Sequence, residues 1–230
     1  MRSTRQQARF AGLLYLMLGL TAPIGLVYVP GQLIVRGDAV ATAERIRSSE
    51  WLLRLGIASE LIHQVIAVFL VLALYRLFSP VDQTHARLLV IFGALLSVPI
   101  MFVNVLNEVA TLTLIGEAGF LDVFSRAERD ALAYLFLRLH GQGISVASVF
   151  WGLWLFPFGL LVIRSGFIPA WLGWLLLIAG AGYLATSFTT LVLPQHAAFV
   201  ESVASPLQFA EVPIIFWLLI RGARPGTDSS

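Results

Sequence analysis

The sequence predicts an all-α, polytopic membrane protein: a bundle of six transmembrane helices with both termini in the cytoplasm. Hydrophobic residues make up 58% of the 230 residues and charged residues only 12%, whereas a soluble domain carries about 25% charge. The apolar residues form long continuous runs rather than short alternating strands. Helices satisfy their own backbone hydrogen bonds in a bilayer, so such runs indicate membrane helices rather than a barrel.

Six apolar runs are long enough to cross a bilayer, which takes about 20 residues. We expect the first to end at Pro30-Gly31, after which Asp38 caps a short surface helix over residues 39–47. Ser79-Pro80 should end the second run, and Pro99 should kink the third. The expected helices cover residues 10–29, 50–78, 87–116, 125–163, 169–193 and 206–220, followed by a disordered tail over residues 221–230.

Two of these helices should start at a capping box, in which a Ser side chain and a Glu or Gln three residues later cap each other's backbone amides. Ser125 with Glu128 has this spacing at the start of the fourth helix, and Ser205 with Gln208 has it at the start of the sixth. The fifth helix should follow a tight turn at Arg164-Ser165-Gly166, with Pro169 in its first turn.

The whole chain, residues 1–230, reads as a single integral membrane domain without a convincing repeat. No cleavage site follows the N-terminal apolar run, so we interpret it as a membrane helix rather than a signal peptide. The sequence contains no Cys, which excludes disulfides and thiolate metal sites. The net charge of +2 comes with basic residues that stand singly, which argues against a nucleic-acid partner.

The distribution of Arg predicts the orientation in the membrane. Eight Arg residues fall on one side of the expected bundle and seven on the other. The eight lie in short tails and turns, where the positive-inside rule applies best, and the seven are interleaved with acidic residues. We therefore expect both termini to be cytoplasmic and the protein to be a multi-pass protein of the inner (plasma) membrane.

Polar side chains gather in one half of the expected bundle. An ionisable residue inside a membrane helix costs roughly 2.5–3.5 kcal/mol on insertion scales, so its presence needs a reason. The start of an even-numbered helix and the end of an odd-numbered one face the same side, here the outside, and all the polar residues lie toward that side. They are Glu60, His63, Gln64, Asn104, Asn107, Glu108, His140, Gln142, Thr186, Ser187, Thr189, Thr190, Gln208 and Glu211.

This shared depth predicts an outward-facing polar pocket, and its residue types suit a metal ion. Glu60 and His63 are three residues apart on one helix face, the Glu-x-x-His spacing of carboxylate metal sites in helical bundles. The candidate ligands of a divalent metal are Glu60, His63, Glu108, His140 (at the rim) and Glu211. Asn104 and Asn107 complete the candidate ligand-binding set, either orienting His63 or bonding between helices.

Several stretches carry a resemblance to a known family. They include Arg9-Phe10-Ala11-Gly12-Leu13-Leu14-Tyr15-Leu16, Leu72-Ala73-Leu74-Tyr75-Arg76-Leu77 and Arg164-Ser165-Gly166-Phe167-Ile168-Pro169. In this order they resemble a bacterial family of membrane proteins classed as domain of unknown function 4386. The resemblance implies a six-helix integral membrane protein and no particular activity, cofactor or site.

Three functions remain open from the residues. The first is a membrane protein whose polar pocket binds a metal ion or a small ligand, with hydrolytic chemistry at a metal-bound water as an extension. The second is a structural or accessory protein whose buried polar residues only organise the bundle. The third is a small-solute transporter, although the inner halves of the helices show no polar path. A haem held by His63 and His140 is a weaker idea, and the sequence decides neither enzymatic activity nor oligomeric state.

Overall fold

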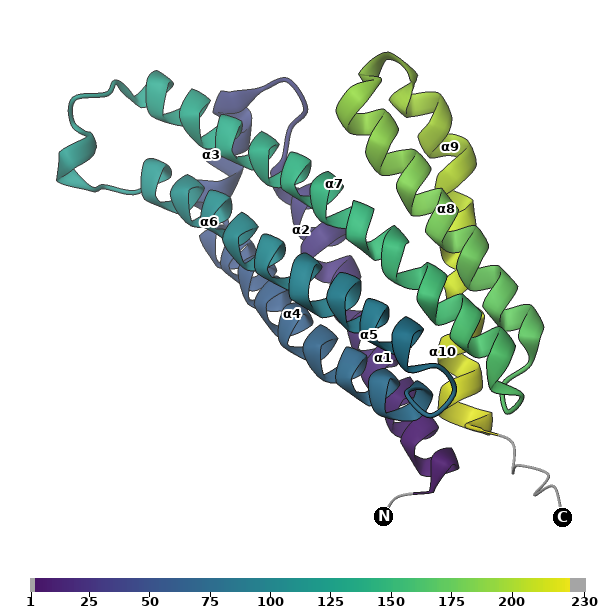
Figure 1. Ribbon diagram of the computed structural model, residues 1–230. Coiled ribbons are helices and arrows are strands. Elements are labelled where there is room, and N and C mark those ends of the chain that lie inside the picture. Colours follow the sequence, from purple (N-terminus) through teal and green to yellow (C-terminus); the bar gives the residue numbers. More distant parts are fainter. Residues whose placement is uncertain (1–2, 224–230) are drawn as a thin grey trace, which may run out of the picture. The chain divides into compact units, whose positions relative to one another are not determined.

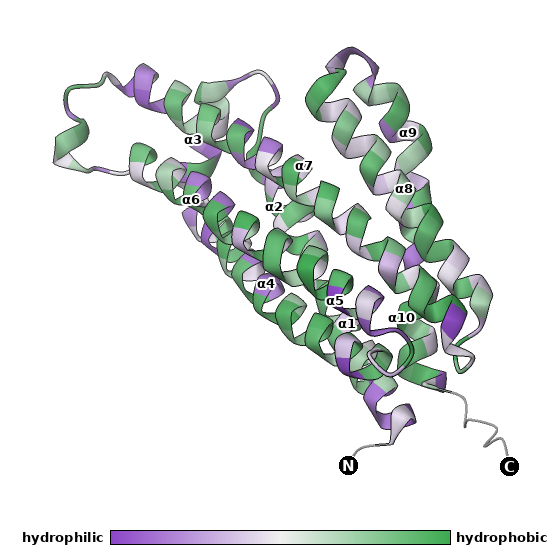
Figure 2. Ribbon diagram, in the orientation of Figure 1, coloured by the Kyte–Doolittle hydropathy of each residue, from purple (hydrophilic) through white to green (hydrophobic). Residues whose placement is uncertain are grey.

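The structure is a computed structural model that describes residues 3–223 (Figure 1). Every regular element in that range is helical, and six helical segments are long and apolar enough to cross a membrane. Hydrophobic residues predominate along these segments (Figure 2). The chain is thus a multi-pass membrane protein by length and composition. The segments are Thr4–Leu33, Glu50–Phe78, Gln83–Ile115, Arg126–Ser165, Ala170–Val192 and Pro194–Arg221. From residue 224 on, the expected tail lies outside the described residues.

The first segment is longer than predicted, because Pro30-Gly31 does not end it. It consists of α1 (Thr4–Pro23), a π-helical turn (Ile24–Tyr28) and α2 (Val29–Leu33). The wide turn closes when the Val29 amide bonds to the Ile24 carbonyl. Pro30 directly follows this turn, so the position of the missing N–H coincides with a local change of the hydrogen-bond pattern inside a continuous helix. The helix therefore continues through the proline to Leu33.

The short helix α3 (Ala39–Ser48) follows, and Asp38 caps it as predicted by accepting a 2.9 Å hydrogen bond from the Ala41 amide. Arg47 forms a salt bridge with Asp130, a residue of α7 that is 2% exposed. Ile46 is fully buried against the surrounding apolar side chains. These contacts fix α3 onto the long helices instead of leaving it free at the surface.

The second and third segments are α4 (Glu50–Phe78) and the run α5 (Gln83–Val90), a π-helical stretch (Ile91–Leu96) and α6 (Ser97–Ile115). The irregularity expected at Pro99 therefore lies one turn earlier. The Ser97 hydroxyl donates to the Gly93 carbonyl at 2.9 Å within it. Proline in a first helical turn is tolerated, and the preceding turn widens instead.

The fourth and fifth segments are α7 (Arg126–Ser165) and α8 (Ala170–Val192). The capping box at the start of α7 is confirmed. Ser125 N–H donates to Glu128 Oε2 at 2.7 Å, and the Glu128 amide donates to Ser125 Oγ at 3.3 Å. The tight turn before α8 contains Gly166 with a φ of +69°, a conformation that favours glycine.

The sixth segment corrects two expectations. It begins at a 3₁₀ turn (Pro194–His196) and continues as α9 (Ala197–Gln208), so Ser205 lies inside a helix and the second capping box is wrong. Gln208 instead donates to Thr186 Oγ1 at 3.1 Å. The segment then passes through a 3₁₀ turn (Phe209–Glu211), α10 (Val212–Phe216) and a π-helical turn (Trp217–Arg221). Pro206 and Pro213 therefore flank an internal break, whereas the sequence predicts a helix start at Ser205-Pro206.

The described chain forms two compact units. The first unit contains Met1–Leu18, Val65–Pro99 and Ser145–Ser230, and the second contains Gly19–Gln64 and Ile100–Ile144. Each has its own apolar core. Phe78 and Phe158 pack edge to face in the first, with ring centroids 5.7 Å apart. Ile46, Leu53 and Leu137 are buried in the second.

Glycines bring helices close together in the first unit, as expected for small residues at membrane helix contacts. A Cβ added to Gly180 would lie 2.9 Å from the Gly152 carbonyl oxygen, and one added to Gly173 would lie 2.5 Å from that of Gly159. The backbones of α7 and α8 are therefore in contact. Gly12 meets the Leu219 backbone in the same manner, at 2.4 Å.

We expect Ser125→Ala to destabilise the start of α7 by about 1 kcal/mol, because it removes the acceptor for the Glu128 amide. Hydrogen exchange of the amides of residues 126–130 should become faster. Ser205→Ala is the matched control, since Ser205 lies inside α9 and caps nothing. Equal exchange in the wild type and Ser125→Ala would show that the cap adds no stability.

Candidate metal site

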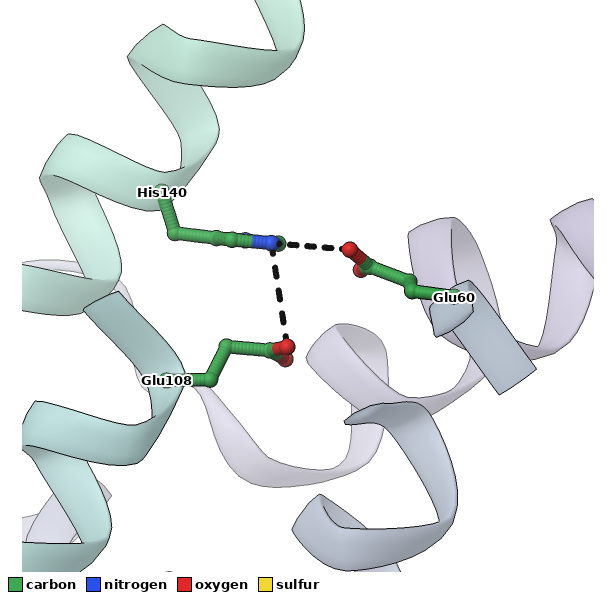
Figure 3. A group of neighbouring side chains, drawn as sticks. All are labelled: Glu60, Glu108 and His140. Atoms are coloured by element: carbon green, nitrogen blue, oxygen red, sulfur yellow. Dashed lines mark hydrogen bonds and ion pairs between the residues drawn. The ribbon is translucent and has the colours of Figure 1, made fainter. Parts of the chain in front are cut away.

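Three buried side chains converge in the second unit: Glu60 from α4, Glu108 from α6 and His140 from α7 (Figure 3). Their exposed fractions are 3%, 3% and 5%. His140 Nε2 lies 3.1 Å from Glu60 Oε2 and 3.8 Å from Glu108 Oε2. One ligand atom from each of the three residues lies within 4.8 Å of the other two. Three long helices thus direct metal-binding groups toward one point.

The charges of this cluster do not balance by themselves. Two ionised carboxylates carry two negative charges, and a protonated His140 would supply only one positive charge. Among the described residues, Glu60 Oε1 and Glu108 Oε2 are buried and have no hydrogen-bond partner. Burying a charged group without compensation is strongly unfavourable. The cluster therefore requires a bound proton or a bound cation, and a divalent ion beside a neutral His140 would balance the two carboxylates fully.

The π-helical turn of the first segment makes room for Glu60. A Cβ added to Gly25, which lies in that turn, would be 2.8 Å from Glu60 Cγ and 3.5 Å from Glu60 Oε1. Any larger residue would push the carboxylate away from its place. The wide turn and the glycine together bring the backbone of the first segment against the acidic side chain.

Asn104 holds the backbone at His140. Its Nδ2 donates to the His140 carbonyl at 2.9 Å, and its Oδ1 accepts from Asn107 Nδ2 at 3.1 Å. The side chain lies against Gly143, where an added Cβ would be only 2.0 Å from Asn104 Oδ1. Asn104 therefore connects α6 to α7 near His140, as interhelical polar residues do, and Asn107 supports its amide from the same helix. The orientation of His63 by Asn104 or Asn107 stays a prediction.

His63 lies outside the three-residue group. Its Nδ1 is 3.0 Å from the Thr21 hydroxyl, and one turn away the Ser59 hydroxyl donates to the Thr21 carbonyl at 2.9 Å. His63 thereby connects α4 to α1 and is half-buried. The Glu-x-x-His spacing identified the right helix, but the imidazole in the cluster comes from α7.

Glu211 belongs to the first unit, where two phenols bind its carboxylate. Tyr15 donates to Oε2 and Tyr183 donates to Oε1, each at 3.0 Å. Both carboxylate oxygens therefore have a hydrogen-bond donor. The participation of Glu211 in the metal site stays a prediction.

Sequence reasoning missed the contributions of Gly25 and Gly143 and misjudged His140, which is buried rather than at a rim. A lone glycine in an apolar run gives no signal of the side chain that will lie against it. Nor does a single histidine near a helix start reveal its burial. These features depend on which helix faces which, and that order is a property of tertiary packing.

Comparisons with known proteins support the family resemblance. Residues 10–222 match the profile of a family described as a domain of unknown function, DUF4386. An uncharacterized protein of Archaeoglobus fulgidus is 26% identical over 171 residues, which are 71% of this chain and 86% of that protein. No solved structure matches the chain.

We expect Gly143→Ala to destabilise the protein by about 1–3 kcal/mol, since the added methyl group overlaps Asn104 and breaks its bond to the His140 carbonyl. Gly141→Ala is the matched control two residues away, because a Cβ there meets nothing within 4 Å. It should be neutral or slightly stabilising, as alanine favours helices. Thermal unfolding in detergent measures both, and equal midpoints would contradict the Asn104 contact.

Proposed function

The chain belongs to the DUF4386 family, and from the geometry of its buried cluster we propose that it binds a divalent metal ion through Glu60, Glu108 and His140. The observation that carries the proposal is the convergence of two buried carboxylates and one imidazole, with ligand atoms within 4.8 Å of one another. The oxygens Glu60 Oε1 and Glu108 Oε2 support it, because they accept no hydrogen bond from a described residue and a cation would satisfy both.

The donor set narrows the choice of metal. One imidazole nitrogen and carboxylate oxygens suit Zn²⁺, Mn²⁺ or Fe²⁺, whereas Mg²⁺ and Ca²⁺ prefer oxygen alone. Three protein ligands leave at least one coordination position for water or a small ligand, as in catalytic zinc sites. A metal-bound water of lowered pKa is the nucleophile that such a site would supply, so hydrolysis is the reaction class it would support.

A structural role is the alternative, and the 3.1 Å contact between His140 Nε2 and Glu60 Oε2 favours it. A shared proton would then stabilise the cluster, and its residues would only hold three helices together. Metal content separates the two functions, because a structural network needs no ion.

The metal proposal predicts that the purified protein, stripped with a chelator and reloaded with Zn²⁺ or Mn²⁺, retains about one ion per chain. Glu108→Gln and His140→Gln should each weaken binding by at least about tenfold, the loss caused even by second-shell changes. Metal analysis and calorimetric titration give both quantities.

Two further variants show whether the site extends beyond three residues. His63→Ala should leave metal binding unchanged, since its Nδ1 contacts Thr21 instead. Glu211→Gln tests the wider ligand set in the same titration. The structural role would be established if the wild-type protein takes up no ion and the Glu108→Gln and His140→Gln variants are nevertheless less stable than the wild type.

The same proposal includes the orientation: both termini in the cytoplasm and the polar residues toward the outside of the plasma membrane. Its support is the concentration of Arg in short tails and turns. A reporter fused after Arg224 should report the cytoplasm, and one inserted at Ser125 should report the exterior. The opposite result at both positions would invert the orientation and turn the cluster toward the cytoplasm.

A further inference from the structure

The second unit has a groove on its surface, separate from the buried cluster. It lies between α4 and α6 and has a volume of ≈ 490 Å³, within the range of about 300–1,000 Å³ that ligand pockets occupy. Ile57, Ala58 and Leu61 line it from α4, and Val109 and Thr113 line it from α6. Ala58 has the smallest side chain among the residues that line it.

Most of the residues that line the groove are apolar, and the groove is open to the surroundings, as a site for a hydrocarbon chain requires. Leu61 is 37% exposed and Val109 is 43% exposed, whereas Glu60 and Glu108, their sequence neighbours, are 3% exposed. The two kinds of residue therefore point in different directions from the same helices. The groove faces outward, and the carboxylates face the interior of the unit.

One end of the groove carries a pair of opposite charges. Arg54, which lines the groove, directs Nε and Nη2 to a single oxygen of Glu50, Oε1, at 2.8 and 2.6 Å. These contacts use neither Arg54 Nη1 nor Glu50 Oε2. The Arg54 side chain is 64% exposed, and Trp51 beside it is 65% exposed at the start of α4. Exposed Trp at a helix end is typical of the membrane–water interface.

We propose that this groove binds a zwitterionic phospholipid with a primary ammonium headgroup, a phosphatidylethanolamine. One acyl chain fills the apolar hollow at Ala58. The phosphate accepts from Arg54 Nη1, since guanidinium groups bind phosphate oxygens well. The ammonium donates to Glu50 Oε2.

The charge pair selects this headgroup over the alternatives. Glu50 and Arg54 together are neutral, so they match a headgroup that carries both charges and give a purely anionic lipid no net attraction. A choline headgroup has no N–H to donate to Glu50. An exposed ion pair contributes little to stability. Glu50 and Arg54 can therefore give up part of their mutual contact and bind the headgroup instead. The proposal does not depend on a metal in the buried cluster.

The test reconstitutes the full chain in vesicles of equal parts phosphatidylethanolamine and phosphatidylcholine with the same acyl chains. Extraction in mild detergent and native mass spectrometry then count the retained lipids. The wild type should retain phosphatidylethanolamine with about tenfold preference, the effect of one charge-assisted hydrogen bond. Arg54→Gln and Glu50→Gln should abolish the preference. Ala58→Trp should abolish retention of either lipid, because the indole fills the hollow.

Two control variants make the result specific to the groove. Arg76→Gln removes an exposed Arg at the other end of α4, and Ala185→Trp adds the same bulk to an exposed position of α8. Both should behave like the wild type, and thermal unfolding verifies that each variant folds. Equal retention of the two lipids by the wild type would overturn the proposal. Undiminished retention by folded Ala58→Trp, or a preference for added phosphatidylglycerol, would overturn it as well.

Discussion

The second unit depends on the charge balance of two carboxylates that are both buried. Glu60 and Glu108 are each 3% exposed, and one imidazole cannot neutralise them both. Unpaired charges at such burial would cost several kcal/mol each, an amount comparable to the stability of a whole domain. The fold therefore needs a cation or a proton at this point. The helices that carry the cluster must also hold its side chains in place, because a displaced carboxylate would lose contact with the cation or proton that balances its charge.

Close packing fixes that geometry. Gly25 and Gly143 leave no space for a methyl group beside Glu60 and Asn104. The first glycine lies against the carboxylate side chain, and the second lies against the amide side chain that holds the His140 carbonyl. In a membrane, helices associate through such close contacts and through polar bonds rather than through the hydrophobic effect. Rigid support from three helices is also what a metal site needs, since ligands must keep their distances without the ion.

The class of the fold could be predicted from the sequence because hydropathy acts locally. Long apolar runs specify membrane helices whatever their neighbours, and the bounds of α4 follow from its flanking polar residues. The predicted helix boundaries are wrong at two prolines, because proline occurs both beside and within helices. Pro30 predicts the end of the first helix, but the helix continues through it to Leu33. Pro206 predicts the start of the sixth helix, but it lies inside α9. Shared depth along the helices predicts Glu60, Glu108 and His140 in the same half of the bundle, with His140 at the rim. Only packing decides that His140 faces the carboxylates and His63 contacts Thr21.

In both units a polar carboxylate lies where a helix departs from regular α geometry. Glu60 lies against the π-helical turn at Gly25, and Glu211 ends the 3₁₀ turn that interrupts the sixth segment. Irregular backbone is tolerated in a membrane only where protein covers it, and such turns occur often at functional sites. Two tyrosines satisfy both oxygens of Glu211, whereas Glu60 and Glu108 each keep one buried oxygen that accepts no hydrogen bond from a described residue. A buried carboxylate thus has a full set of hydrogen bonds in the first unit and lacks some of them in the second. Missing hydrogen bonds are what we expect of carboxylates that receive an ion.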